Sequence, residues 1–475
     1  MTSNTFLVGP GTDSAELRGG LSLHADTLYQ QIAERTPKIW PVLMLIAKAA
    51  EQRGWSLYIV GGAVRDLLLD LLGDSQSLTD IDLVVEEPSA GAVKDAAQGT
   101  EKGAGVVLAE AIRAEYAEIE TQVHGQFQTA VLTWQSWQID IATARKESYP
   151  YPAANPEVHS SSIHQDLCRR DFTINAMALA LTGAQPGQLL DLFNGQLDLQ
   201  QRFVRVLHVD SFIDDPTRIF RAVRFSVRLG FELEAQTEQL IRTAVSSGVY
   251  ARSRSKYKKV PALQSRLKAE LKYLLEETGW EKSLIQLNDL GALICLDDHL
   301  TITSELLRQL RRMERWIRKF EVDQPRWLLM LELVLAQLET DRGDRVAHWL
   351  DLGVQSQHRL HHVHVWEAHL IEQSQKVTCP SEVYELLRSH SRAELLLMAD
   401  RHPHTLGPSI WHYIIHLAAI PALINGATLK RLGYSPGPQF KKILTDIHHH
   451  QLDGKLTTAK SAEQYILARY SKSEL

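Results

Sequence analysis

The chain has 475 residues, a hydrophobic content of 44% and a formal net charge of −6. This length exceeds what one hydrophobic core supports, so we exclude a single-domain protein, and the net charge gives no global indication of a nucleic-acid partner. The three cysteines, Cys168, Cys295 and Cys379, lack disulfide or zinc-ligand spacing, which argues against a structural metal site and predicts a reducing compartment.

The first 36 residues are predicted to form an N-terminal extension punctuated by glycine and proline. A secretory leader has a positively charged segment followed by an apolar one, and these residues do not show that pattern. The apolar run "IWPVLMLIAKAA" is too short to cross a bilayer and contains Pro41 and Lys48. We therefore expect a cytoplasmic protein without membrane contact.

A predicted helix at residues 40–53 is followed by a strand, "SLYIV", and by "GGAVRDLLLDLL", an apolar helix after a Gly61-Gly62 turn. Two glycines between a strand and a helix let the backbone approach a ligand, and the helix N-terminus offers N–H groups to phosphate. Arg65, one turn later, can add a bidentate contact. An ordinary strand-to-helix turn is the alternative interpretation.

The next predicted strand, "TDIDLVV", carries Asp80 and Asp82 on one face, because side chains alternate along a strand. Two carboxylates this close repel each other unless a cation neutralises them, and Mg²⁺ prefers such oxygen ligands. After a predicted mobile loop near residues 99–105, "FQTAVLTW" and "SWQIDIATA" alternate like antiparallel strands with a turn at Gln135-Ser136. Asp140 is a further candidate carboxylate, with a plain surface position as the alternative.

Two later segments gather arginine beside aspartate. In "RRDFTINAMAL", Asp171 follows a pair of arginines and can cap a helix. In "DDPTRIFRAVRF", Pro216 fits the first helical position and Asp215 the N-cap. Four arginines then follow one flank of the predicted helix at spacings of three and four, which indicates an anionic or acceptor-rich ligand alongside: Arg218, Arg221, Arg224 and Arg228.

From about residue 210 onward the pattern is helical and strand signals vanish. Residues 252–273 contain eight basic residues and one acidic residue, and residues 305–320 contain six basic and two acidic residues. Such stripes suit a polyanion groove, although solvated helix faces explain either stripe alone. The histidine-rich C-terminal region has irregular spacing, which favours surface histidines over a metal site.

Five motifs in this order resemble the class II tRNA nucleotidyltransferase and bacterial poly(A) polymerase family: "GGAVRD", "TDIDLVV", "RRDFTINAM", "LLDLFNGQLDL" and "DDPTRIFRAVRFSVRLGF". The resemblance covers about residues 57–275, and "LKRLGYSPGPQFKKIL" near the C-terminus matches more weakly. It implies an α/β head of the polymerase-β-like nucleotidyltransferase fold, with a mixed or antiparallel sheet, and all-α neck, body and tail. The expected parts are the extension 1–36, head 37–185, neck 186–275 with a base-selecting helix, and tRNA-binding body and tail 276–475.

The resemblance also implies the roles of individual residues. Asp80 and Asp82 are expected to be catalytic and to hold two Mg²⁺ ions. Asp215 and Arg218 are expected to serve as an amino-acid template for the incoming base. The remaining residues implied to contact the nucleotide are Gly62, Arg65, Arg170, Arg221 and Arg224.

The template role is chemically consistent. A carboxylate only accepts hydrogen bonds and a guanidinium only donates them, so the pair suits the amino group and ring nitrogen of cytosine or adenine. Guanine and uracil present the reverse order. Each buried mismatch costs about 1–3 kcal/mol.

The expected function is therefore addition of C, A or both from CTP and ATP to the 3′ end of tRNA. Asp214 stands where many members have glutamate, which leaves complete CCA addition, CC addition alone and A addition alone open. A divided pathway would imply a complementary partner enzyme. A poly(A) polymerase, a signalling nucleotidyltransferase with a small-molecule acceptor, and an inactive RNA-binding protein also fit the sequence.

Overall fold

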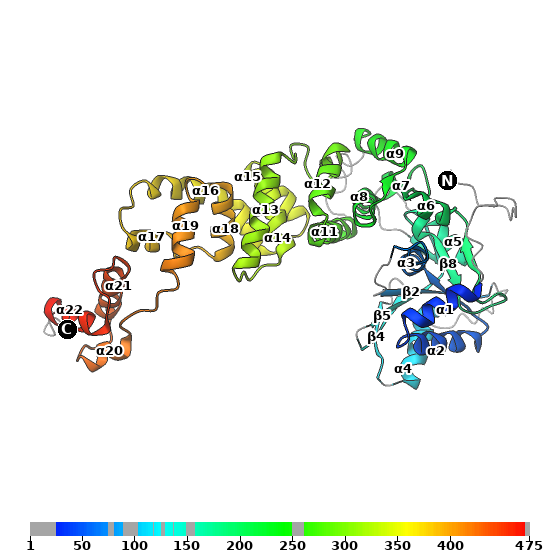
Figure 1. The fold of residues 1–475 in the computed structure, drawn as a ribbon, viewed down its shortest axis with the longest axis horizontal. Helices are drawn as coiled ribbons and strands as arrows, with labels where there is room; N and C mark the ends of the chain where they lie inside the picture. The colour runs from blue at the N-terminus through cyan, green and yellow to red at the C-terminus, as the bar shows by residue number, and fades with distance from the viewer. Residues whose placement is uncertain are drawn as a thin grey trace. The chain divides into compact units, whose positions relative to one another are not determined.

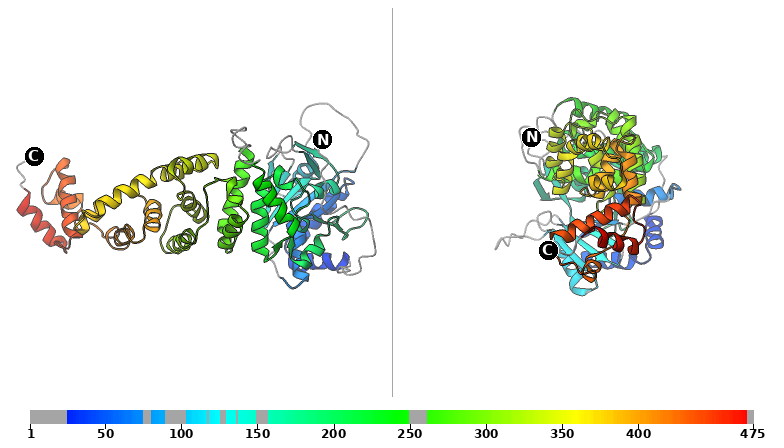
Figure 2. Two further views of the ribbon diagram at one scale, coloured as in Figure 1. Left: turned by 90° about the horizontal axis from the view of Figure 1, so that it is seen from above. Right: turned by 90° about the vertical axis from the view of Figure 1, so that its left-hand side faces the viewer.

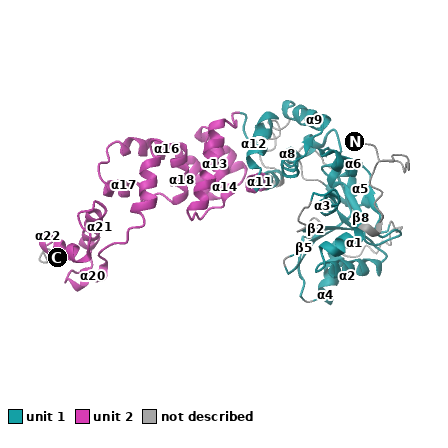
Figure 3. Cartoon of the chain, viewed as in Figure 1, with its two compact units in different colours: residues 1–270, 277–298 teal, residues 271–276, 299–475 magenta. Residues whose placement is uncertain are grey.

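The computed structural model describes residues 25–74, 80–88, 103–116, 118–124, 129–135, 137–148, 157–248 and 261–470. The chain forms two compact units, which are described separately. Unit 1 comprises residues 1–270 and 277–298, and unit 2 comprises residues 271–276 and 299–475 (Figure 3). No helix within the described ranges is both long and apolar enough to cross a membrane.

A seven-stranded sheet organises unit 1, with strand order β3-β4-β5-β2-β1-β8-β9. Only the β2–β5 pair is parallel, so the sheet is mixed, as the sequence predicted. The strands are β1 (Ser56–Val60), β2 (Asp80–Glu86), β3 (Glu120–His124), β4 (Thr129–Trp134), β5 (Trp137–Thr143), β8 (Met177–Ala180) and β9 (Leu189–Asp191). Two small sheets pair β6 (Arg145–Ser148) with β7 (Glu157–Ser160) and β10 (Phe203–Val204) with β11 (Glu232–Leu233).

The face of the sheet that carries the predicted carboxylates is covered in part by helix α5 (Ile163–Cys168). Val60, Val84 and Ala178 pack with Ile163 and Leu167 in one buried cluster. Since alternate side chains of β2 share a face, the first two aspartates of that strand point to the same side as Val84. The chain leaving α5 therefore emerges beside them.

The remaining helices of unit 1 include α2 and α4, which pack against the strands (Figure 1). They are α1 (Ala25–Arg35), α2 (Trp40–Glu51), α3 (Gly62–Leu71), α4 (Ala104–Glu115), the 3₁₀ turn η2 (Thr173–Asn175), α6 (Gly195–Gln201), α7 (Ser211–Asp214), α8 (Thr217–Leu229), α9 (Ala235–Ser246), α12 (Trp280–Asp289) and the 3₁₀ turn η3 (Ala292–Cys295). Helix α11 (Pro261–Glu276) is shared by the two units.

Unit 2 consists of helices, and the described residues beyond β11 contain no strand (Figure 2). The helices are α13 (Ser304–Lys319), α14 (Arg326–Leu335), α15 (Thr340–Trp349), α16 (Val354–Ser374), α17 (Pro380–Leu387), α18 (Arg392–Arg401), α19 (Gly407–His412), the π-type turn η4 (Tyr413–Leu417), α20 (Gly426–Arg431), α21 (Pro438–Leu452) and α22 (Ala459–Arg469). An α/β part followed by helices confirms the predicted fold class.

Several local predictions are confirmed and others are wrong. The strands at 56–60 and 80–85 and the hairpin are present, and Gln135 takes the turn with φ 55°. The segment after Asp171 forms only the 3₁₀ turn η2 and no α-helix. This turn leads into β8, a strand that is buried on both faces and therefore shows no polar alternation in the sequence. The predicted absence of strands after residue 210 misses β11, which pairs with the distant β10.

Two predictions fall partly outside the described residues. Of the predicted loop near 99–105, residues 99–102 are not described, and α4 begins at Ala104. Of the predicted extension, residues 25–35 form α1. This helix attaches to the rest of unit 1, because the Tyr29 hydroxyl donates to the carbonyl of Leu181 at 2.8 Å and Arg35 pairs with Asp70 at 2.8 Å.

Candidate active site

Three carboxylates share one face at the junction of β2 and β5. The parallel register places Asp82 beside Asp140 and Asp80 beside Gln138. Solvent reaches Asp82, yet protein atoms surround its carboxylate, and this desolvation raises its pKa. Asp140 and Asp80 raise that pKa further, while Arg170 and Arg65 oppose the rise. The site is therefore crowded with negative charge.

This donor set fits a divalent cation that completes its shell with substrate oxygens. Mg²⁺ is usually bound through one or two carboxylates together with phosphates, and not by an all-protein cage. Within the described part of the chain, no three His, Cys, Asp or Glu side chains form such a cage. Asp80 and Asp82 are the residues that would hold the ion.

Gly61 lies directly beside the carboxylates and leaves no room for a side chain. Its φ of 68° is in the left-handed region, and an added Cβ would lie 2.8 Å from Arg170 Nη1 and 3.9 Å from Asp82 Oδ2. Only glycine meets both conditions. Gly62, the predicted phosphate contact, is the first residue of α3 and lies directly after this close approach.

Arg65 is directed into the protein, whereas the sequence suggested a side chain that reaches for phosphate. It is 3% exposed, donates from Nε to Asp66 at 2.8 Å and donates from Nη1 to Asn175 at 2.7 Å. Its charge still acts on Asp82, whose pKa it lowers. Asn175, which the sequence analysis missed, is thus part of the site.

Arg170 is held by a second residue that the sequence analysis missed, the fully buried Asp166. This carboxylate accepts from Arg170 Nη2 at 2.9 Å and from Arg169 Nη2 at 2.8 Å. Burial alone raises the pKa of Asp166, but the two arginines outweigh it and hold the pKa below its ordinary value. The available signal was the spacing of four residues between Asp166 on α5 and Arg170, which lies just beyond the end of that helix.

Asp171 connects the sheet-bearing part of unit 1 to helix α8. Its Oδ2 accepts from Arg221 Nε at 2.8 Å, and its Oδ1 accepts from Asn175 Nδ2 at 3.1 Å. Burial acts to raise the pKa of Asp171, but Arg221, the Asn175 hydrogen bond and Arg218 lower it to about 2. Arg221 also donates to Glu270 at 2.8 Å, and these carboxylates outweigh burial and raise its own pKa.

The predicted template pair lies at the start of α8. The helix begins at Thr217 with Pro216 as its N-cap, one residue later than predicted, because Asp215 caps from outside. Asp215 Oδ1 accepts from the Thr217 N–H at 3.0 Å, and Oδ2 lies 3.4 Å from Arg266 Nε. Arg218 donates from Nη2 to the carbonyl of Arg169 at 2.9 Å, which ties α8 to the segment after α5.

Two of the arginines on α8 form ion pairs with acidic residues of the protein. Arg224 is buried and donates to Glu270 at 3.0 Å and to Glu277 at 3.3 Å, in addition to the pairs formed by Arg221. Arg228 is exposed. The protein itself thus supplies acidic partners to Arg221 and Arg224, so these two arginines need no anionic ligand to balance their charge.

The fourth motif, "LLDLFNGQLDL", packs against η2 and supports it. Asp191 accepts from the N–H groups of Gly195 at 2.7 Å and Gln196 at 2.9 Å, and Asp198 accepts from the Thr173 hydroxyl at 2.6 Å. A Cβ on Gly195 would lie 2.5 Å from the Thr173 carbonyl oxygen. The motif thereby fixes the backbone that carries Asn175.

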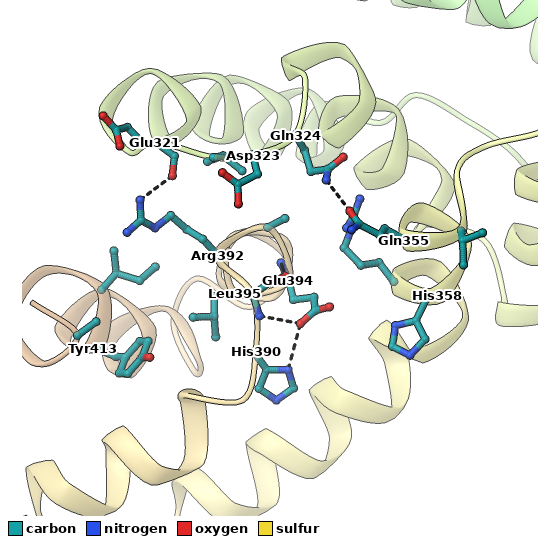
Figure 4. Close-up of a pocket in the computed structure, with 17 residues that line it drawn as sticks. Glu321, Asp323, Gln324, Gln355, His358, His390, Arg392, Glu394, Leu395 and Tyr413 are labelled. Atoms are coloured by element: carbon teal, nitrogen blue, oxygen red, sulfur yellow. Dashed lines mark hydrogen bonds and ion pairs between the residues drawn. The ribbon is translucent and has the colours of Figure 1, made fainter. Parts of the chain in front are cut away.

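Unit 2 contains a cavity of about 950 Å³ that is remote in sequence from these motifs (Figure 4). His358, His390, Arg392 and Tyr413 are among its lining residues. None of the predicted site residues lines it, so the candidate active site is the open carboxylate face of unit 1.

Comparison with known proteins supports this choice. A family model described as the poly(A) polymerase head domain matches residues 57–205. An A-adding tRNA nucleotidyltransferase of Geobacter sulfurreducens is 30% identical over 90% of this chain, which spans 46% of that relative's length. An A-adding tRNA nucleotidyltransferase of Halalkalibacterium halodurans is 28% identical over 94% of this chain and 96% of its own.

A solved structure of a related enzyme is also similar to this chain. The CCA-adding enzyme of Thermotoga maritima, complexed with tRNA, matches with a TM-score of 0.69 and 30% identity. The match covers 93% of this chain and 98% of that one. The likeness therefore includes both the sheet-bearing part and the helical part of the chain.

Proposed function

Because the chain belongs to the tRNA nucleotidyltransferase and poly(A) polymerase family, we propose that it adds C, A or both from CTP and ATP to the 3′ end of tRNA. The observation that carries the proposal is the convergence of the motifs. Asp82, next to Asp80 on the same strand face, lies near Arg170, and the backbone carbonyl of Arg169 accepts a hydrogen bond from Arg218 of the predicted base-selecting helix. These contacts support the proposal that a metal-dependent reaction centre and a base-reading pair belong to one site.

In the proposed reaction the terminal 3′-hydroxyl of tRNA attacks the α-phosphate of the nucleotide. A new phosphodiester bond forms, the bond between the α- and β-phosphates breaks, and pyrophosphate leaves with its electron pair. Asp80 and Asp82 would hold Mg²⁺, which would supply charge stabilisation to the phosphates and lower the pKa of the attacking hydroxyl. Gly62 and Arg170 are proposed to contact the triphosphate, and the buried Arg65 is proposed to act on it through its charge.

The base is proposed to be selected by Asp215 and Arg218. Asp215 accepts from the amino group of cytosine or adenine, and Arg218 donates to the neighbouring ring nitrogen. Arg221 and Arg224 are proposed to support the nucleotide through their fixed positions on α8. Discrimination against uracil and guanine then follows from mismatched donors and acceptors, at about 1–3 kcal/mol each.

We propose the division into head 37–185, neck 186–275 and body with tail 276–475, with the helical parts binding tRNA by shape and phosphate contacts. A cytoplasmic location stays a prediction.

Addition of A alone is a second candidate. It is favoured by the two A-adding relatives, one of which matches along almost its whole length. In that case a separate CC-adding enzyme would supply the substrate.

The test uses two tRNA transcripts, one ending at the discriminator base and one ending in CC. Each is incubated with Mg²⁺ and labelled CTP, ATP or both, and product lengths are read on a gel. Three additions to the first transcript indicate a complete CCA-adding enzyme, and ATP addition only to the second indicates A addition. A long adenosine ladder indicates a poly(A) polymerase.

The matched control is the double variant Asp80→Ala, Asp82→Ala, which should add nothing. Activity retained by this variant, or no addition by the wild type to either transcript, would contradict the proposal. The second result would favour the inactive RNA-binding protein.

A further inference from the structure

Three arginines surround the ring of Phe225, a residue 6% exposed on α8. The guanidinium carbon of Arg65 lies 5.1 Å from the ring centroid, that of Arg221 lies 5.4 Å away, and that of Arg224 lies 4.9 Å away. All are within the range at which a ring quadrupole attracts a cation. One aromatic side chain therefore contacts arginines from two distant parts of unit 1.

The same arginines belong to a continuous chain of hydrogen bonds beside that ring. Arg65 donates to Asn175, Asn175 donates to Asp171, and Asp171 accepts from Arg221. Glu270 then bridges Arg221 and Arg224 at 2.8 and 3.0 Å. Acidic partners thus hold the guanidinium groups of Arg221 and Arg224, and these two groups and that of Arg65 all lie near the ring of Phe225.

The two ends of this hydrogen-bond network lie next to different parts of the proposed site, the carboxylates and the base-selecting helix. Arg65 lies next to the carboxylates through the backbone, because its N–H donates to the carbonyl of Gly61 at 3.1 Å and a Cβ on Gly61 would lie 3.9 Å from Asp82 Oδ2. Arg221 and Arg224 belong to α8, the helix whose first turns carry Arg218 and follow Asp215. A residue that contacts both ends can set the position of the base-reading helix relative to the carboxylates.

We propose that Phe225 is a positioning residue for nucleotide selection, which acts through the cation–π contacts of its ring with Arg65, Arg221 and Arg224. This inference rests on the proposed function. Simple core packing is the competing explanation, because Phe225 also contacts Phe172 edge to face at 5.9 Å. The two explanations differ in whether the electron density of the ring matters.

The experiment replaces Phe225 in the full chain with mono-, di- and trifluorophenylalanine, which keep the shape of the ring and progressively weaken its quadrupole. The readout is the ratio of kcat/KM for the nucleotide that the wild type incorporates to kcat/KM for UTP. Loss of one cation–π contact corresponds to a change of about five-fold at an exposed site and about thirty-fold at a desolvated one, so the ratio should fall stepwise to a total within that range across the series. The melting temperature should stay near that of the wild type.

The same series at Phe172 is the matched control. Phe172 is fully buried in the same aromatic pair, and no cation lies over its ring among the described residues. Fluorination there should leave the ratio unchanged. A flat response at Phe225, or an equal response at Phe172, would overturn the inference while the proposed function stands.

Leucine variants give a second measurement. Phe225→Leu and Phe172→Leu should lose comparable stability, but only Phe225→Leu should lose selectivity against UTP. Equal selectivity in the two variants would overturn the inference. A wild type that incorporates no nucleotide would overturn the proposed function and this inference with it.

Discussion

At the scale of single residues, the site contains some ionised groups that destabilise the folded state and others that stabilise it. Asp82 belongs to the first kind, because desolvation of its carboxylate by the surrounding protein and two neighbouring carboxylates raise its pKa, although solvent reaches the residue. Asp171 belongs to the second kind, because arginine and amide partners lower its pKa to about 2. The two aspartates should therefore respond in opposite ways when their charge is removed.

Asp82→Asn should abolish nucleotidyl transfer and leave the melting temperature unchanged or higher in the absence of divalent cations. A raised folded-state pKa means that the ionised carboxylate destabilises the folded state at neutral pH, so removing its charge removes that penalty. Thermal unfolding with and without Mg²⁺ checks this, and Mg²⁺ should stabilise the wild type more than the variant. Asp74→Asn, at an exposed ion pair with Arg202, should change neither property.

Asp171→Asn should lower the free energy of unfolding of unit 1 by about 2 kcal/mol at neutral pH. A lowered folded-state pKa means that the carboxylate stabilises the fold above its unfolded-state pKa of about 4, and that this stability is lost as the pH falls toward about 2. Urea unfolding of wild type and variant from about pH 7 to 3 checks this. A difference that stays constant across that range would contradict the assignment.

At the scale of elements, the active site depends on how the motif around Gly195 supports η2. The left-handed Asn194 and the absence of a Cβ at Gly195 let this loop touch the Thr173 carbonyl. Because η2 leads to Asn175 and β8, a displacement here would move the residues that hold Arg65. The close approach of Gly195 to the Thr173 carbonyl therefore links the packing of this loop to the position of the site residues.

Gly195→Ala should destabilise unit 1 by about 1–3 kcal/mol and lower nucleotidyl transfer, because its Cβ would meet the Thr173 oxygen at 2.5 Å. Gly343→Ala is the control of opposite sign. It lies inside α15, where the new Cβ would meet only an ordinary contact at 3.5 Å, so the variant should be stabilised by about 0.5–1 kcal/mol. Chemical unfolding of both variants measures the contrast, and a neutral Gly195→Ala would contradict this supporting role.

The elements of unit 1 differ in how far they could be predicted. Strands β1 and β2 were predictable because apolar and polar residues alternate or form β-branched runs between glycine-rich turns. Strand β8 was not, because its four residues are all buried and one of its two partners, β1, is distant in sequence. Local patterns carry no information about such pairings.

The same limit applies to the site. Asp80 and Asp82 could be found from strand alternation, and Asp215 from its capping position. The inward direction of Arg65 could not, because its partner Asn175 is 110 residues away. Neither could the carboxylates that neutralise the arginines of α8, since Glu270 comes from α11.

At the scale of the whole molecule, the proposed function needs a surface for a large polyanion. Helix α13 of unit 2 carries exposed Arg315 and Lys319. The Lys319 ammonium lies 5.4 Å from the ring centroid of Phe320 and 5.9 Å from that of Trp316, and Trp316 packs on Trp411 at 3.9 Å. Cationic and aromatic groups together suit contacts with both phosphate and exposed bases.

The double variant Arg315→Glu, Lys319→Glu should weaken tRNA binding about ten-fold or more at low salt and leave the KM for ATP or CTP unchanged. Each phosphate contact that is lost should reduce the slope of log affinity against log salt concentration by about 1. The control variant Lys48→Glu, Lys376→Glu changes two exposed lysines by the same total charge and should keep the wild-type slope. Filter binding of tRNA across a salt series separates the two cases. If both variants lose affinity equally, the effect comes from net charge alone and α13 is not part of the tRNA surface.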